Sequence, residues 1–154
     1  MRGFFEVGIY HAKTRENIGT LWRTAYQLGA AGVFTVGARY RPQSSDTLKV
    51  PRHIPLRHFA DMDALHAALP SSAPLVGVEM GGQSLGGFVH PQRAIYLLGA
   101  EDHGLPPDVI ARCHAVVSLE SIRAASYNVA VAGALVLYDR LFSGKTMKFA
   151  DGTP

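Results

Sequence analysis

Short apolar segments alternate with helical patterns along the chain, and this alternation constrains the fold more than any other feature. The apolar segments are mostly continuous rather than interrupted by polar residues, as in a parallel sheet covered on both faces. They are predicted to be strands over residues 5–10, 32–37, 74–80, 94–99 and 115–119, with a shorter strand at 53–56. Strands separated by helices favour an α/β fold built on a parallel sheet.

Helical patterns fill the intervals between these segments. The first begins at Asn17, which is predicted to cap the helix, and others are expected over 61–69, over 106–113 and from Ser126. Within the last helix, residues 129–138 are apolar or small all round, which demands burial on every side. A second subunit covering the side that the sheet leaves open predicts a homodimer through this helix, and burial within one chain is the alternative.

Composition places the chain among cytoplasmic globular proteins. Its 154 residues, 47% apolar and 18% charged, are predicted to form one domain, 1–154. The last ~10 residues are expected to form a flexible tail. No apolar run reaches the ~20 residues that span a membrane, and the first residues lack the pattern of a signal peptide. The single cysteine, Cys113, fits a reducing cytoplasm, and no Cys/His spacing indicates a metal site.

Positive charge gathers in one stretch of the chain. The net charge is +3, and residues 38–60 hold five Lys or Arg, two His and a single acid. One interpretation is a solvated connection. The other is a basic arm with Tyr40 among the charges, suited to the phosphates and a base of a nucleic acid.

Three stretches are predicted to meet at the carboxyl edge of the sheet, where ligands of open α/β folds bind. Arg23 lies opposite the apolar stripe of the first helix, the loop 99–104 is flanked by glycines, and 118–128 leaves the last strand. Each also has an interpretation without a functional role: a surface arginine, a strand-to-helix turn and a pair of helix caps. Together they predict a site.

The same three stretches carry motifs that resemble those of the SpoU/TrmH branch of the SPOUT RNA methyltransferases. The residues that match are Asn17 and Arg23 in the first motif, Gly99, Glu101, Gly104, Leu105 and Pro106 in the second, and Ser126, Asn128, Val129 and Tyr138 in the third. Two departures stand out. The usual Ile-Pro-Met is replaced at 118–120, and Tyr127 stands where Leu or Met is common.

The resemblance implies a Rossmann-like parallel sheet with a carboxyl-terminal trefoil knot, and a dimer whose site lies near the interface. It also implies S-adenosylmethionine as cofactor. The residues expected to hold the cofactor are Val78, Glu79, Leu98, Gly99, Glu101, Ser118, Leu119 and Ser126.

The reaction implied is methyl transfer to a ribose 2′-hydroxyl of RNA, with tRNA favoured as substrate and rRNA left open. The expected catalytic residues are Arg23, Asn17, Glu101 and Asn128. Arg23 is either the base, which conflicts with a guanidinium pKa above ~12, or a clamp on phosphate and developing alkoxide charge. Contacts to RNA are expected from Lys13, Arg15, Arg23, Arg39, Arg41 and Arg52.

Three other functions are weighed against this one. An RNA base methyltransferase of the wider SPOUT group would use an acidic base instead of Arg23. A non-catalytic RNA-binding or assembly protein would have degraded motifs. A nucleotide-binding oxidoreductase is disfavoured because no G-x-G-x-x-G opens the first helix.

Overall fold

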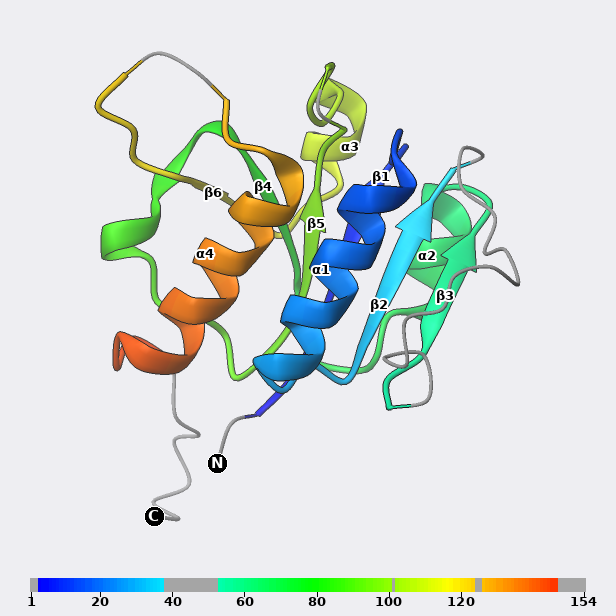
Figure 1. Cartoon of the computed structure of the whole chain (residues 1–154), viewed down its shortest axis with the longest axis horizontal. Coiled ribbons are helices and arrows are strands. Elements are labelled where there is room, and N and C mark those ends of the chain that lie inside the picture. Colours follow the sequence, from blue (N-terminus) through cyan, green and yellow to red (C-terminus); the bar gives the residue numbers. More distant parts are fainter. Residues whose placement is uncertain (1–2, 38–52, 101, 124–125, 147–154) are drawn as a thin grey trace.

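Continuous apolar strands form one six-stranded sheet in the computed structural model, which describes residues 3–37, 53–100, 102–123 and 126–146. All five pairings between neighbouring strands are parallel, in the order β3-β2-β1-β5-β4-β6 (Figure 1). The strands are β1 (Phe4–Tyr10), β2 (Gly32–Val36), β3 (Leu56–Phe59), β4 (Leu75–Ser84), β5 (Arg93–Leu98) and β6 (Ala115–Ser118). The predicted α/β fold with a parallel, Rossmann-like sheet is confirmed.

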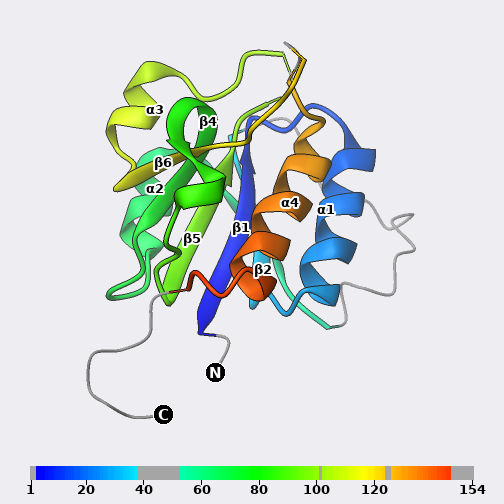
Figure 2. The same ribbon diagram turned by 90° about the vertical axis from the view of Figure 1, so that its left-hand side faces the viewer.

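Helices cover both faces of this sheet. They are α1 (Arg15–Gln27), α2 (Met62–Ala68), α3 (Pro107–Ala111) and α4 (Val129–Phe142), with a short 3-10 turn, η2, at Leu85–Gly87. Turning the molecule by 90° shows α1 and α4 on one face and α2 and α3 on the other (Figure 2). The core is divided accordingly, with Val7 and Ile9 facing α1 and α4 and with Ile95 and Leu97 in the cluster of α2 and α3. Burial on both faces explains the largely continuous apolar sequences of β1, β2 and β5, whereas the edge strand β3 is only half-buried.

The structure corrects two of the predicted helix starts. Asn17 does not cap α1, because Thr14 is the extended residue before the helix and its Oγ1 accepts the Asn17 backbone N–H at 3.4 Å. The last helix begins at Val129 rather than at Ser126, with Asn128 as its cap.

One predicted strand is also displaced. The short strand lies at Leu56–Phe59 instead of 53–56. Pro55 falls in the predicted range and accepts the Val33 N–H at 2.9 Å, but it has no N–H to donate in return. The paired residues run from Val33 opposite Leu56 to Val36 opposite Phe59.

One face of α4 is left open. Its inner face is buried against the sheet and α1, and a Cβ on Gly133 would lie only 2.5 Å from Leu21 Cδ1, which explains the small residue there. The outer face carries Val131, Leu135, Tyr138 and Phe142, which are 46%, 41%, 60% and 65% exposed. The alternative that one chain buries this helix on every side is therefore wrong, and the homodimer stays a prediction. Among the described residues no helix combines the length and apolarity that a membrane span requires.

A buried polar network joins the amino end of β5 to the carboxyl end of α4. His90 is fully buried, with Nε2 2.8 Å from Asp139 Oδ2 and Nδ1 2.7 Å from Tyr96 Oη. Because a carboxylate oxygen accepts, the ring proton sits on Nε2, and Nδ1 accepts from the Tyr96 hydroxyl. Arg140 Nη1 donates to that hydroxyl at 3.0 Å. Burial raises the pKa of Tyr96 to about 12, and burial lowers that of His90 although Asp139 opposes the shift.

This network predicts a stability that depends on pH. The pKa of His90 in the folded protein lies below the ordinary value of 6.5, so the unfolded chain takes up this proton first as pH falls. Stability is therefore present above about pH 6.5 and is lost as pH falls toward the folded pKa. We expect the thermal midpoint of the protein to drop between about pH 7.5 and about pH 5.5, and His90→Gln to show a smaller drop in the same scans. Equal drops in the two proteins would contradict this assignment.

Candidate active site

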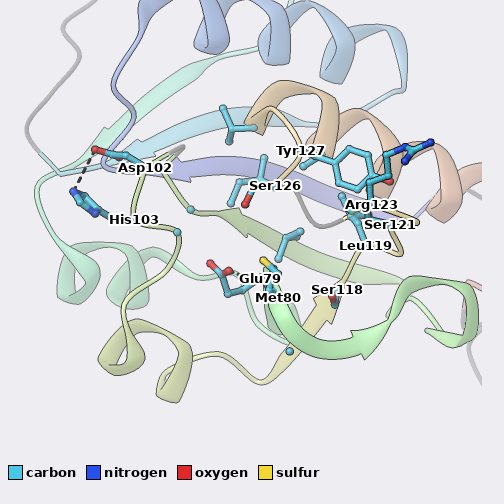
Figure 3. Close-up of a pocket in the computed structure, with 18 of the residues that line it drawn as sticks. Glu79, Met80, Asp102, His103, Ser118, Leu119, Ser121, Arg123, Ser126 and Tyr127 are labelled. Carbon is cyan, nitrogen blue, oxygen red and sulfur yellow. Dashed lines mark hydrogen bonds and ion pairs between the residues drawn. The ribbon is translucent and has the colours of Figure 1, made fainter.

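A cavity of about 600 Å³ opens at the carboxyl edge of the sheet, and α4 begins beside it (Figure 3). Seven of the eight predicted cofactor residues line it: Val78, Glu79, Leu98, Gly99, Ser118, Leu119 and Ser126. The eighth, Glu101, lies outside the described residues. The structure thus brings the predicted set together from β4, β5, β6 and the loops after them, while their role as cofactor ligands stays a prediction.

A break in strand pairing opens this cavity. Val78 pairs with both Leu98 of β5 and Val117 of β6, but the next paired residue of β4 is Gln83, also opposite Val117. The extra residues between them leave the ladder, and 79–81 line the cavity. Bulges of this kind recur beside active sites because they re-aim side chains. The sequence carried no signal for this break beyond the glycines at 81 and 82.

The described ends of the loop after β5 are bonded to each other, and Glu79 holds the residue that follows. Glu79 Oε2 accepts the backbone N–H of Leu105 at 2.6 Å, and Gly104 N donates to Ala100 O at 2.9 Å. Gly104 has a φ of +61°, and a Cβ there would overlap the Glu79 carboxylate. A Cβ on Gly99 would overlap the Gly104 backbone and lie 2.6 Å from Leu105 N. Both glycines are therefore required by the loop itself, which forms one wall of the cavity.

Lys13 is tied to the rim of the cavity. Its Nζ lies 2.5 Å from Asp102 Oδ2, and His103 Nε2 lies 3.3 Å from the same oxygen. The hydrogen bond from Lys13 is the largest of the effects that lower the pKa of Asp102. Asp102 and His103 line the cavity (Figure 3) and were not foreseen as site residues. The predicted RNA contact of Lys13 stays a prediction, since the ammonium has a carboxylate partner here.

Asn17 and Asn128 meet, although 111 residues separate them. Asn128 Nδ2 donates to Asn17 Oδ1 at 3.0 Å. The Asn128 Oδ1 atom accepts the N–H groups of Ala130 at 2.9 Å and Val131 at 3.2 Å. Capping α4 thus fixes the Asn128 amide, and that amide in turn orients the Asn17 carbonyl. The two predicted catalytic asparagines join the starts of α1 and α4.

Arg23 is exposed on α1, opposite the buried Leu21 and Trp22 side, and it is not among the described residues that line the cavity. Arg15 is exposed in the first turn of the same helix. Arg39, Arg41 and Arg52 lie outside the described residues. The described parts of the chain contain no cluster of three or more His, Cys, Asp or Glu side chains that suits a metal ion.

Several residues of the cavity escaped sequence reasoning. The sequence marks Tyr127 only as a departure from a motif, and it does not mark Met80, Ile122 or Arg123, which also line the cavity. Their neighbours in sequence pointed to the right loops, but nothing in the residue types alone marked these side chains.

The cavity fits S-adenosylmethionine in size and chemistry. Ligand sites measure roughly 300–1,000 Å³ and combine an apolar lining with a few polar groups. Val78, Leu98 and Leu119 supply apolar surface, and Ser118 and Ser126 supply hydroxyl groups.

The fold and this cavity define a parallel α/β protein with a ligand site at the carboxyl ends of its strands. The chain belongs to the SpoU rRNA Methylase family, whose sequence profile matches residues 5–138. Membership confirms the predicted family and the class of enzyme, an S-adenosylmethionine-dependent RNA methyltransferase. No curated protein matches the sequence significantly.

Solved structures share the fold. One, determined for the 2-OH methylation of C/U34 on tRNA, has a TM-score of 0.81 at 25% identity over 91% of this chain and 95% of that one. The SpoU methyltransferase AviRb from Streptomyces viridochromogenes, bound to AdoMet, has a TM-score of 0.79 at 25% identity. That match covers 92% of this chain and 58% of the other.

A third structure, an AdoMet-bound rRNA methyltransferase from Sinorhizobium meliloti, has a TM-score of 0.78 at 24% identity, which shows the fold alone. It matches 91% of this chain and 56% of its own length. The chain thus spans nearly all of the first relative and little more than half of the other two.

Proposed function

We propose that this protein transfers a methyl group from S-adenosylmethionine to a ribose 2′-hydroxyl of tRNA. The observation that carries the proposal is that residues of the second and third motifs line the same cavity. Asn17 of the first motif accepts a hydrogen bond from Asn128 of the third, which joins the first motif to this group. The likeness to a structure concerned with 2-OH methylation on tRNA supports ribose as the target and tRNA as the substrate.

In this reaction the residues of the chain bind the cofactor and the RNA and orient the ribose hydroxyl. S-adenosylmethionine, when bound, supplies a methyl group already activated on its sulfonium. Holding the hydroxyl in line with that methyl group supplies much of the rate. The loop fixed by Glu79 forms a wall against which the cofactor is held. Asn17 and Asn128 hold the starts of α1 and α4 in register and so position the face that carries Arg23.

Arg23 acts as a clamp in this proposal. A guanidinium stays charged in a protein, and in this structure Arg23 is exposed rather than buried. A charged, exposed arginine binds the phosphate next to the target ribose and stabilises negative charge as the hydroxyl loses its proton. Glu101 is proposed to orient the ribose, and Arg15, Arg39, Arg41 and Arg52 to bind the RNA backbone.

Substrate choice is tested with matched RNAs. We expect labelled methyl transfer to hypomodified tRNA at a rate well above that to rRNA presented at equal nucleotide concentration. A preference for rRNA would keep the reaction and change the substrate.

We also propose that the protein is a homodimer through α4. The exposed apolar stripe of Val131, Leu135, Tyr138 and Phe142 follows helical spacing on one face, as expected of a helix that another subunit covers. In such a dimer each cavity can also receive side chains from the other subunit, and we propose that Arg23 is one of them.

The proposed dimer predicts that a single charge in the interface strongly raises its dissociation constant. Leu135→Glu places a carboxylate in the centre of the stripe, so we expect the dissociation constant of the dimer to rise at least about 100-fold. Light scattering across a dilution series measures it. Ala67→Glu, on the exposed side of α2 across the sheet, is the control and leaves the mass unchanged. A monomeric wild type, or a dimeric Leu135→Glu, would rule out this interface.

Two further features are proposed from the resemblance. The first is a trefoil knot in the carboxyl-terminal part of the chain, where Lys145 Nζ donates to the carbonyls of Leu85 at 2.7 Å and Gly86 at 2.9 Å. These contacts join the end of α4 to the β4–β5 connection. An experimental trace of the chain through 119–128 decides the knot.

The second is a cytoplasmic location, in keeping with the single cysteine and the proposed RNA substrate.

A further inference from the structure

The segment between β6 and α4 covers one side of the cavity and is bonded across its own ends. Tyr127 Oη donates to the backbone carbonyl of Glu120 at 2.6 Å. Leu119 and Ser126, the immediate neighbours of these two residues, both line the cavity. The hydrogen bond therefore ties the strand end to the helix start. It lies beside the cavity wall where Figure 3 labels Leu119, Ser126 and Tyr127.

Glu120 is itself held in place from the other side. Its Oε1 accepts from the Ser84 hydroxyl and from the backbone N–H of Gly86, the latter at 2.7 Å. The hydrogen bond from Ser84 is the largest cause that lowers the pKa of the Glu120 carboxyl. Ser84 ends β4, the strand whose bulge lines the cavity, and Lys145 binds the Gly86 carbonyl. Tyr127 is thus attached to a fixed point rather than to a free loop.

The hydrogen bond of the Tyr127 hydroxyl acts on the loop more than on the stability of the fold. The residue is 39% exposed, so a hydrogen bond there exchanges for one with water and adds little to the stability of the fold. Its effect falls on the two ends of the segment, Glu120 and Tyr127, which the hydrogen bond holds together before a ligand arrives. Ordering a binding loop in advance lowers the entropy that binding must overcome.

We infer that Tyr127 and Glu120 form a clamp that presets the width of the cofactor cavity, with Tyr127 as a positioning residue for S-adenosylmethionine. This inference rests on the proposed function. Tyr127 stands where the third motif commonly has Leu or Met, and Glu120 stands where the usual Ile-Pro-Met before that motif is replaced. The motif alone therefore does not supply the clamp.

Tyr127→Phe tests the clamp because it keeps the ring and removes the hydroxyl. We expect the Kd for S-adenosylmethionine, measured by calorimetry, to rise about 5- to 10-fold. We expect kcat at saturating cofactor to stay within about twofold, and the thermal midpoint without cofactor to stay within about 1 °C of the wild type. Tyr26→Phe is the matched control, since Tyr26 is 41% exposed on α1 and leaves the cavity untouched.

Glu120 supplies the second arm of the test. Glu120→Gln keeps an oxygen that accepts from Ser84 and Gly86 and is expected to bind the cofactor nearly as the wild type does. Glu120→Ala loses both bonds and is expected to weaken binding, and adding Tyr127→Phe to it is expected to weaken binding by less than the two separate effects combined.

The outcomes are separable. A Kd of Tyr127→Phe within twofold of the wild type overturns the clamp, as does a fall in thermal midpoint with unchanged affinity. Failure of the wild type itself to bind S-adenosylmethionine overturns the proposed function, and the clamp with it.

Discussion

Gly99→Val is expected to abolish methyl transfer by closing the cofactor cavity. A Cβ at this position overlaps the Gly104 backbone and lies 2.6 Å from Leu105 N, which is itself bonded to Glu79. The loop from Ala100 to Gly104 has to shift, and both of those residues line the cavity. We expect the Kd for S-adenosylmethionine to rise at least about 100-fold, equivalent to about 2.7 kcal/mol or more.

Gly87→Val is the control for this change. A Cβ on Gly87 meets no atom within 4 Å, so the same side chain is added to open space. Calorimetry with the cofactor and circular dichroism of the fold measure the two variants together. A folded Gly99→Val protein that binds the cofactor as tightly as the wild type would show that the cavity is not the cofactor site.

Arg23→Ala is expected to lower turnover by about 10²- to 10³-fold, the range seen when one group that stabilises developing charge is removed. Arg23 is not among the described lining residues of the cavity, so the affinity for S-adenosylmethionine is expected to stay near that of the wild type. Arg23→Lys keeps the charge but loses the planar fork, and it is expected to recover only part of the rate.

Single-turnover rates on hypomodified tRNA measure this effect apart from RNA binding. Gln27→Ala, another exposed residue of α1 one turn further on, serves as the control. Full turnover of Arg23→Ala on bound RNA would contradict both roles of Arg23, as base and as clamp.

The sheet was predictable from the sequence because its strands are buried on both faces, which leaves a continuous apolar pattern. Boundaries were less predictable, since they depend on neighbours. β3 begins after Pro55 rather than at residue 53. Thr14 caps α1 in place of Asn17, because Thr14 precedes the first helical turn. The outer stripe of α4 was foreseen as apolar, and the structure adds which residues form it.

The site was predictable as a set of loops but not as a set of contacts. The family resemblance led to Gly99, Ser118 and Ser126, which the structure brings to one cavity. The hydrogen bond of Tyr127 to the Glu120 carbonyl and the ion pair of Lys13 with Asp102 depend on how distant segments cross, and residue types alone do not report that.

The most direct test of the account is the identity of the methylated product. The protein is incubated with hypomodified tRNA and S-adenosylmethionine labelled on the methyl group, and the RNA is digested to nucleosides. We expect label in a 2′-O-methyl nucleoside, and loss of that label with Arg23→Ala. Label on a base, or no transfer by a protein that binds both the cofactor and tRNA, would contradict ribose methylation of tRNA as its function.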